Sequence, residues 1–154
     1  MAKGAQDWIA RTDILLQSLS EIIQRPRLGT INVVDVSGNV AANTANLVMA
    51  IIGAGMHFGG YIYGDSSGVI EDDYITVVAD GNTVIFPTVK KFYDYGFTQP
   101  VGAEGFCTYY DPVNFRYGFA ISQGKTWNTS YLMYYTEAHG RNPYVNLKFI
   151  YATF

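Results

Sequence analysis

The residues best suited to chemistry are few and widely separated along the chain. The two histidines, His57 in GMHFGGY and His139 in EAHGRNP, have no second histidine, cysteine or acid at the spacing of a zinc site. Ser130, His139 and Asp111 supply the residue types of a nucleophilic triad, but we expect no serine in the turn sequence that exposes such a nucleophile. The sequence therefore predicts no catalytic residue, no metal site and no cofactor, and we expect a protein that is not an enzyme. We expect His57 to lie in a strand and His139 in a turn.

Two further groups have ordinary structural interpretations. Glu71, Asp72 and Asp73 are adjacent, and they lack the alternating ligand spacing of a calcium loop, so we expect a solvated turn. Cys107 is the one cysteine, which rules out a disulfide within the chain. Its apolar surroundings in GFCTYYD favour a small core residue over a nucleophile.

The segment TWNTSYLMYY concentrates aromatic side chains. Trp127 and Tyr131, together with Tyr134 and Tyr135, are of the type that stacks on the apolar faces of sugar rings. A glycan platform at Trp127 and Tyr131 is therefore one hypothesis. The alternative, which we favour, is that Trp127 packs at the end of a strand while the tyrosines alternate between core and interface.

Composition limits the classes of function. The 154 residues fit one domain with a usable core. Charged residues make up 15% of the chain, below the usual quarter, and the 13 tyrosines suit both strands and interfaces. A net charge of −3 without a basic patch argues against nucleic-acid binding. The longest apolar run, from Leu47, is too short to cross a bilayer, and the start lacks the apolar region of a signal peptide, so we expect cytoplasmic synthesis and no membrane partner.

An amphipathic helix is predicted near the start of the chain. At about 100° per residue, the apolar side chains between Trp8 and Ile23, with the exception of Ile14, fall within an arc of roughly 140°. Pro26 ends the pattern. A helix this short is marginal alone in water, so its stripe must be buried against the chain's own sheet or against a neighbouring subunit. We hypothesise the second, with residues 1–28 as an arm and 29–154 as the β domain. The proposed assembly interface comprises Trp8, Leu15, Leu19 and Ile22.

Beyond Gly29 the apolar pattern changes to the period of two that is typical of strands. We expect a turn at Ser37-Gly38-Asn39, a break at residues 53–55, and a type I′ hairpin at Asp80-Gly81. One helical turn is expected before Gly96. Alternation places Val145, Leu147, Phe149 and Tyr151 on one face, and Phe115, Tyr117, Phe119 and Ile121 on another. Eight or nine short strands at regular spacing predict a mainly β protein, an antiparallel sandwich or barrel of jelly-roll type.

The chain resembles structural proteins of bacteriophage and virus particles, of the jelly-roll decoration, cement or fibre-head type. The resemblance is architectural: a short amphipathic N-terminal segment followed by a Tyr- and Gly-rich β body. It rests on no motif and assigns no site residue. It implies a location in the virion, as a capsid-decoration or tail-associated homotrimer that contacts other virion proteins. This non-enzymatic structural role is the first hypothesis, and a carbohydrate- or receptor-binding β-sandwich module is the alternative.

Overall fold

The computed structural model describes residues 29–66, 71–99, 105–122 and 124–154. This part of the chain is mainly β, as predicted, with one short helix, α2 (Val89–Asp94). Residues 1–28, which hold the predicted helix and its stripe of Trp8, Leu15, Leu19 and Ile22, lie outside the described residues. The strands are β1 (Ile31–Asn39), β2 (Ala45–Ile52), β3 (Gly55–Asp65), β4 (Tyr74–Ala79), β5 (Asn82–Ile85), β6 (Gly105–Asp111), β7 (Arg116–Ile121), β8 (Thr126–Trp127), β9 (Ser130–Thr136) and β10 (Tyr144–Thr153).

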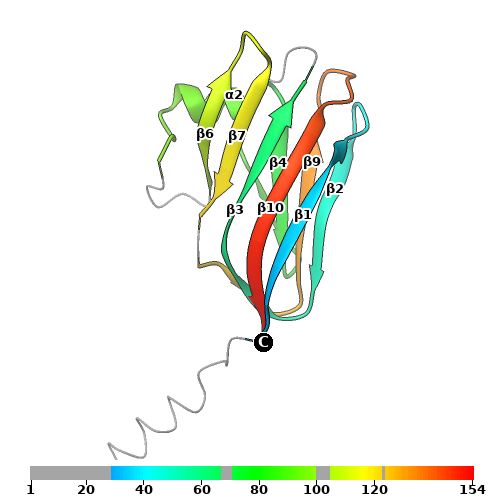
Figure 1. The fold of residues 1–154 in the computed structure, drawn as a ribbon, viewed down its shortest axis with the longest axis vertical. Helices are drawn as coiled ribbons and strands as arrows, with labels where there is room; N and C mark the ends of the chain where they lie inside the picture. The colour runs from blue at the N-terminus through cyan, green and yellow to red at the C-terminus, as the bar shows by residue number, and fades with distance from the viewer. Residues whose placement is uncertain (1–28, 67–70, 100–104, 123) are drawn as a thin grey trace, which may run out of the picture.

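The strands form two antiparallel sheets that face each other (Figure 1). The larger sheet has the order β1-β10-β3-β7-β6, with β8 beside β3, and the smaller has the order β2-β9-β4-β5. Strands far apart in the sequence are therefore neighbours: β10, at the end of the chain, lies between β1 and β3.

The core lies between the sheets. Alternation directs one set of side chains inward, such as Ile62 and Leu147 from the larger sheet and Met133 from the smaller, each 0% exposed. Aromatic rings also join the layers, since Tyr117 of β7 stacks on Tyr135 of β9 with ring centroids 6.2 Å apart. On β10 the predicted alternation is confirmed as far as Ile150, with residues 145, 147 and 149 buried and Tyr144 and Ile150 exposed, whereas Tyr151 is half-buried and Ala152 is buried. Cys107, 1% exposed, is a core residue as predicted.

Two of the local predictions are confirmed, and two are wrong. Asp80 (φ 51°) and Gly81 (φ 79°) connect β4 to β5 with the positive φ angles of a type I′ turn. Gly96 (φ 74°) follows α2 as predicted. The turn predicted at residues 37–39 is wrong, because β1 continues through Asn39, pairing along β10 as far as Tyr144. Phe115, predicted in a strand on the same face as Tyr117, instead has φ 53° in the turn before β7.

Candidate ligand-binding groove

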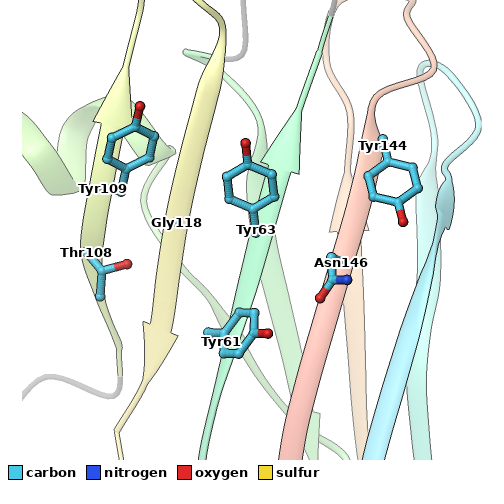
Figure 2. Close-up of a pocket in the computed structure, with 7 residues that line it drawn as sticks. All are labelled: Tyr61, Tyr63, Thr108, Tyr109, Gly118, Tyr144 and Asn146. Carbon is cyan, nitrogen blue, oxygen red and sulfur yellow. The ribbon is translucent and has the colours of Figure 1, made fainter.

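A hollow lies on the outer face of the larger sheet, the face turned away from the core (Figure 2). It has a volume of about 560 Å³, and its lining comes from four strands: β3, β6, β7 and β10. We call it the tyrosine groove. Its lining residues are Tyr61, Tyr63, Thr108, Tyr109, Gly118, Tyr144 and Asn146.

The period of the strands explains why these side chains point outward. On β3, Tyr61 and Tyr63 flank the fully buried Ile62. On β10, Tyr144 and Asn146 alternate with buried residues 145 and 147. Because successive side chains of a strand point to opposite faces, a well-packed core on one side places these polar and aromatic groups on the other.

Strand register then brings them together. Tyr63 is the pairing partner of Asn146 on one side and of Gly118 on the other. Gly118 in turn pairs with Tyr109 of β6. The register between β6 and β7 shifts at Cys107/Tyr109, which marks a β-bulge, and both Thr108 and Tyr109 are exposed there. Tyr109, Gly118, Tyr63 and Asn146 therefore form one row across four strands.

Gly118 forms the floor of the groove between two tyrosines. A methyl group at this position would lie 2.8 Å from Thr108 Oγ1 and 3.4 Å from Tyr109 Cβ. Tyr63 and Tyr109 stand on strands two spacings apart, about 9–10 Å, with only the glycine strand between them. The lack of a side chain at Gly118 thus leaves room for the Thr108 side chain, which lies against this buried backbone.

The aromatic rings of the groove are accessible. Tyr61, Tyr109 and Tyr144 are 44%, 46% and 44% exposed. A tyrosine offers an apolar ring face together with a hydroxyl group that donates and accepts hydrogen bonds. Asn146 and Thr108 add an amide and a hydroxyl group. This combination suits a ligand that is apolar on its ring faces and rich in hydroxyl groups at its edges.

Ion pairs and a carboxylate border the row on either side. Arg116 Nε lies 3.1 Å from Asp65 Oδ2, and Lys148 Nζ lies 3.5 Å from Asp35 Oδ2. Asp111 accepts hydrogen bonds from the Asn114 side chain and the Tyr109 hydroxyl group, at 2.7 and 3.1 Å. The bond from Asn114, with other local donors, lowers the pKa of Asp111. The carboxylate is therefore ionised at neutral pH, and its contact with the hydroxyl group orients the Tyr109 ring.

The aromatic residues singled out from the sequence lie elsewhere. Trp127 and Tyr131 are each 1% exposed and pack on one another in the core, with ring centroids 4.9 Å apart. Neither ring presents a face to a sugar, so the glycan platform hypothesised at these two residues is not formed. Trp127 packs at a strand end, as the favoured alternative predicted.

The residues of the imagined triad are not brought together. Ser130 and His139 stand at opposite ends of β9, which is about 20 Å long. His57 is buried on β3 between the rings of Tyr131 and Phe149, at centroid distances of 5.9 and 5.3 Å. His139 lies in a bend, as predicted, and its Nε2 is 3.2 Å from Asp72 Oδ2.

The expectation that no serine stands in the sequence of a nucleophile turn is wrong. Residues 64–68 read Gly-Asp-Ser-Ser-Gly, the spacing of a nucleophile turn. That turn needs a helix after its strand, whereas the next described element after β3 is strand β4. Within the described residues, no group of three or more His, Cys, Asp or Glu side chains is arranged to hold a metal ion.

The acidic segment at residues 71–73 is in part the predicted solvated turn, since Glu71 and Asp72 lie in a turn and Asp72 is exposed, but Asp73 departs from it. Asp73 is 1% exposed and accepts hydrogen bonds from the Tyr135 hydroxyl group and from the backbone N–H of Ala138, the latter at 3.0 Å. Burial raises the pKa of Asp73 above its ordinary value. The second buried acid, Glu137, accepts backbone N–H groups of Asn43 and Gly140, both within 2.9 Å. These acids fix loops at the end of the sheets where β9 stops.

Comparisons with known proteins do not assign this chain to a family. No family model matches it, and no curated protein matches it. Among solved structures, a serine protease of Aeromonas sobria is similar at 12% identity and a TM-score of 0.35, and the same protease in complex with its chaperone is similar at 14% identity and a TM-score of 0.35. Each similarity covers 86% of this chain and 29% of the other chain, so the chain spans less than a third of those proteins. No helix among the described residues has the length and apolar character needed to span a membrane.

Proposed function

We propose that this protein is a non-catalytic binding module that recognises carbohydrate through the tyrosine groove. The observation that carries the proposal is the gathering of four tyrosines on the outer face of the larger sheet, two of them on either side of Gly118. A volume of about 560 Å³ lies within the range of small-molecule sites, roughly 300–1,000 Å³. The proposal moves the sugar-binding surface from Trp127 and Tyr131 to the opposite face of the larger sheet.

The strand order supports a jelly roll. When the two-residue β8 and the edge strand β6 are set aside, eight strands remain. If these eight strands are renumbered from 1 to 8 in chain order, β7, β9 and β10 become strands 6, 7 and 8. One sheet then has the strand order 1-8-3-6, and the facing sheet has the order 2-7-4-5. This is the arrangement of jelly rolls, which occur in lectin domains and in viral capsid proteins alike. The fold therefore accommodates both hypotheses, and the choice between them depends on the surface.

A second candidate function, a subunit of a virus or phage particle, is favoured by the edge of the molecule. β1 is an edge strand, and Ile31 and Val33 on it are 63% and 55% exposed. Beside it, Leu47 of β2 is 54% exposed and lines a hollow of about 290 Å³ between the two edge strands. An apolar edge strand is a template for pairing with another chain. This surface is suited to a homotrimer or to contacts with other virion proteins, with residues 1–28 as an added arm.

The carbohydrate proposal is tested by titration calorimetry with a panel of soluble oligosaccharides. Tyr63→Ala removes a central ring of the groove. Because an aromatic contact contributes about 0.5–1.5 kcal/mol beyond its buried area, we expect affinity to fall roughly ten-fold or more. Tyr95→Ala is the matched control, since Tyr95 is 68% exposed and lies outside the groove. Equal affinities of both variants and the unchanged protein would remove the groove from the binding site.

A further inference from the structure

We propose that the tyrosine groove binds the interior of a neutral, linear glycan chain, which lies across the strands and not along them. This inference rests on the proposed carbohydrate function and specifies its ligand. It is carried by the direction of the aromatic row, by where that row ends, and by the charges beside it.

The row has the length of a chain and not of a single sugar. Tyr109, Gly118, Tyr63 and Asn146 are successive pairing partners on β6, β7, β3 and β10. Three strand spacings separate the first from the last, a span of about 14 Å. This is longer than any one six-membered ring, so the row has room for several linked rings. One ring fits between Tyr63 and Tyr109, over Gly118 and the Thr108 side chain that lies beside it (Figure 2).

The row also runs from one edge of the sheet to the other. Asn146 pairs with Ser37 of β1, a small side chain on the edge strand. At the other end, Tyr109 is on β6, the opposite edge strand. A ligand lying in this row therefore passes over both edges of the sheet. Such a path suits recognition along a chain, whereas recognition of a chain end needs a closed pocket.

The charges beside the row favour a ligand without charge. Each cation is already paired, Arg116 with Asp65 and Lys148 with Asp35. Asp111 adds a third carboxylate next to Tyr109. Three carboxylates against two cations give the border of the groove a net charge of −1. Among the residues that the structure describes at this border, a uronic acid or a sulfated sugar would meet no unpaired cation, and like charges repel.

The experiment measures binding of the full chain by titration calorimetry to three kinds of probe. The first is a set of neutral linear hexasaccharides of glucose, xylose, mannose and N-acetylglucosamine. The second is the corresponding monosaccharides, and the third is hexagalacturonate. We expect at least one neutral hexasaccharide to bind ten-fold or more tightly than its monosaccharide and than hexagalacturonate. Chemical reduction of the chain end should leave that affinity unchanged.

Gly118→Ala tests the floor of the groove, because the added methyl group lies 2.8 Å from Thr108 Oγ1 and displaces that side chain while removing no aromatic ring. We expect at least a ten-fold loss of affinity for the neutral hexasaccharide. Gly38→Ala is the matched control, since Gly38 is also in a strand of this sheet but a methyl group there has nothing within 4 Å. Thermal melting of both variants shows whether they fold, and Tyr63→Ala replaces Gly118→Ala if that variant does not.

The outcomes separate this inference from the proposed function. Binding of hexagalacturonate or of monosaccharides as tight as that of neutral chains, with loss in Tyr63→Ala, would overturn the neutral-chain inference and leave a sugar site in the groove. Loss of affinity on reduction of the chain end would likewise overturn recognition along the chain. No binding of any sugar, or binding that Tyr63→Ala leaves unchanged, would overturn both proposals.

Discussion

Gly64 and Tyr117 form a packing pair that can be tested by double substitution. Gly64 of β3 pairs with Tyr117 of β7, and the ring of Tyr117 occupies the space where a side chain at residue 64 would start. A methyl group on Gly64 would lie 2.1 Å from Tyr117 Cε1 and 2.7 Å from its hydroxyl oxygen. Ordinary carbon contacts are about 3.5–4.0 Å, so the ring would have to move by more than 1 Å.

The ring has no free space into which it can move. Tyr117 is 0% exposed and stacks on Tyr135 with an angle of 6° between the ring planes. We therefore expect Gly64→Ala to have the overpacking cost of a dense core, about 1–3 kcal/mol. Alanine is more favourable than glycine in a strand by about 0.5–1 kcal/mol, which offsets part of this cost. With an overpacking cost of about 3 kcal/mol, the free energy of unfolding falls by roughly 2 kcal/mol.

Tyr117→Val should also destabilise the protein, because it leaves a cavity in the core. Removal of a whole aromatic side chain lowers the free energy of unfolding by about 3–5 kcal/mol, and we expect a loss of a few kcal/mol here. In the double variant the new methyl group has room beside the smaller valine. We expect the double variant to be more stable than the sum of the single losses predicts, by about 1–3 kcal/mol.

Urea unfolding followed by tryptophan fluorescence measures all three variants. With a slope of about 2 kcal/mol per molar urea, a loss of 2 kcal/mol moves the midpoint by about 1 M. Gly38→Ala is the control and should move it little, since no atom lies within 4 Å of the added methyl group. A fully stable Gly64→Ala variant, or strict additivity in the double variant, would refute the packing argument.

Three further predictions concern other parts of the molecule. Hydrogen bonds from backbone N–H groups of residues 128–130 lower the pKa of Asp80 to about 2. The ionised Asp80 therefore stabilises the fold fully above pH 3.8, and this stabilisation is lost as the pH falls towards 2. The melting temperatures of Asp80→Asn and of the unchanged protein should converge over that interval, and a constant difference between them would contradict this prediction. Tyr135→Phe removes the hydroxyl donor to the buried Asp73, leaves it the bond from the backbone N–H of Ala138, and should cost about 1–3 kcal/mol. Because burial already raises the pKa of Asp73, stability should fall as the pH rises through that pKa, and urea unfolding should show this fall extended to higher pH in the variant; an unchanged profile would exclude the contact. Removal of residues 1–25 should leave a β body that melts cooperatively but no longer assembles, and Leu19→Asp in the full chain should also impair assembly. Light scattering measures the assembly, and a truncated chain that assembles normally would contradict the hypothesis that residues 1–28 form an assembly arm.

Much of the fold could be predicted because its signals are local. The turn at Asp80-Gly81 needs two positive φ angles, which aspartate and glycine adopt readily. The buried faces of β7 and β10 follow from alternation within a single strand. The turn at residues 37–39 was predicted wrongly because Ser37 and Gly38 have local preferences for turns, while pairing with β10, more than 100 residues later, holds them in a strand.

The candidate site was harder to find because its residues come from distant strands. Alternation alone places Tyr61 and Tyr63 together, and likewise Tyr144 and Asn146. It does not say that β3 and β10 are neighbours, since their pairing is decided by the global topology. The tyrosine-rich segment around Tyr131 attracted the carbohydrate hypothesis because it is dense in sequence, and yet its rings fill the core. Density along the chain is thus a weaker signal of a site than exposure on one shared face.

The bulge in β6 shows why part of the groove could not be found by alternation at all. From the buried Cys107, a regular strand would direct Tyr109 inward, to the same face. The register shift between these residues adds one residue on β6 opposite β7, so that Tyr109 pairs with Gly118 and faces outward while Tyr110 pairs with Tyr117. Without that extra residue, a phenol ring would enter a core that Phe119 and Tyr117 already fill, and the wall of the groove opposite Tyr63 would be absent. The same irregularity therefore relieves the core and completes the surface, which links the packing of this protein to the site that we propose as its function.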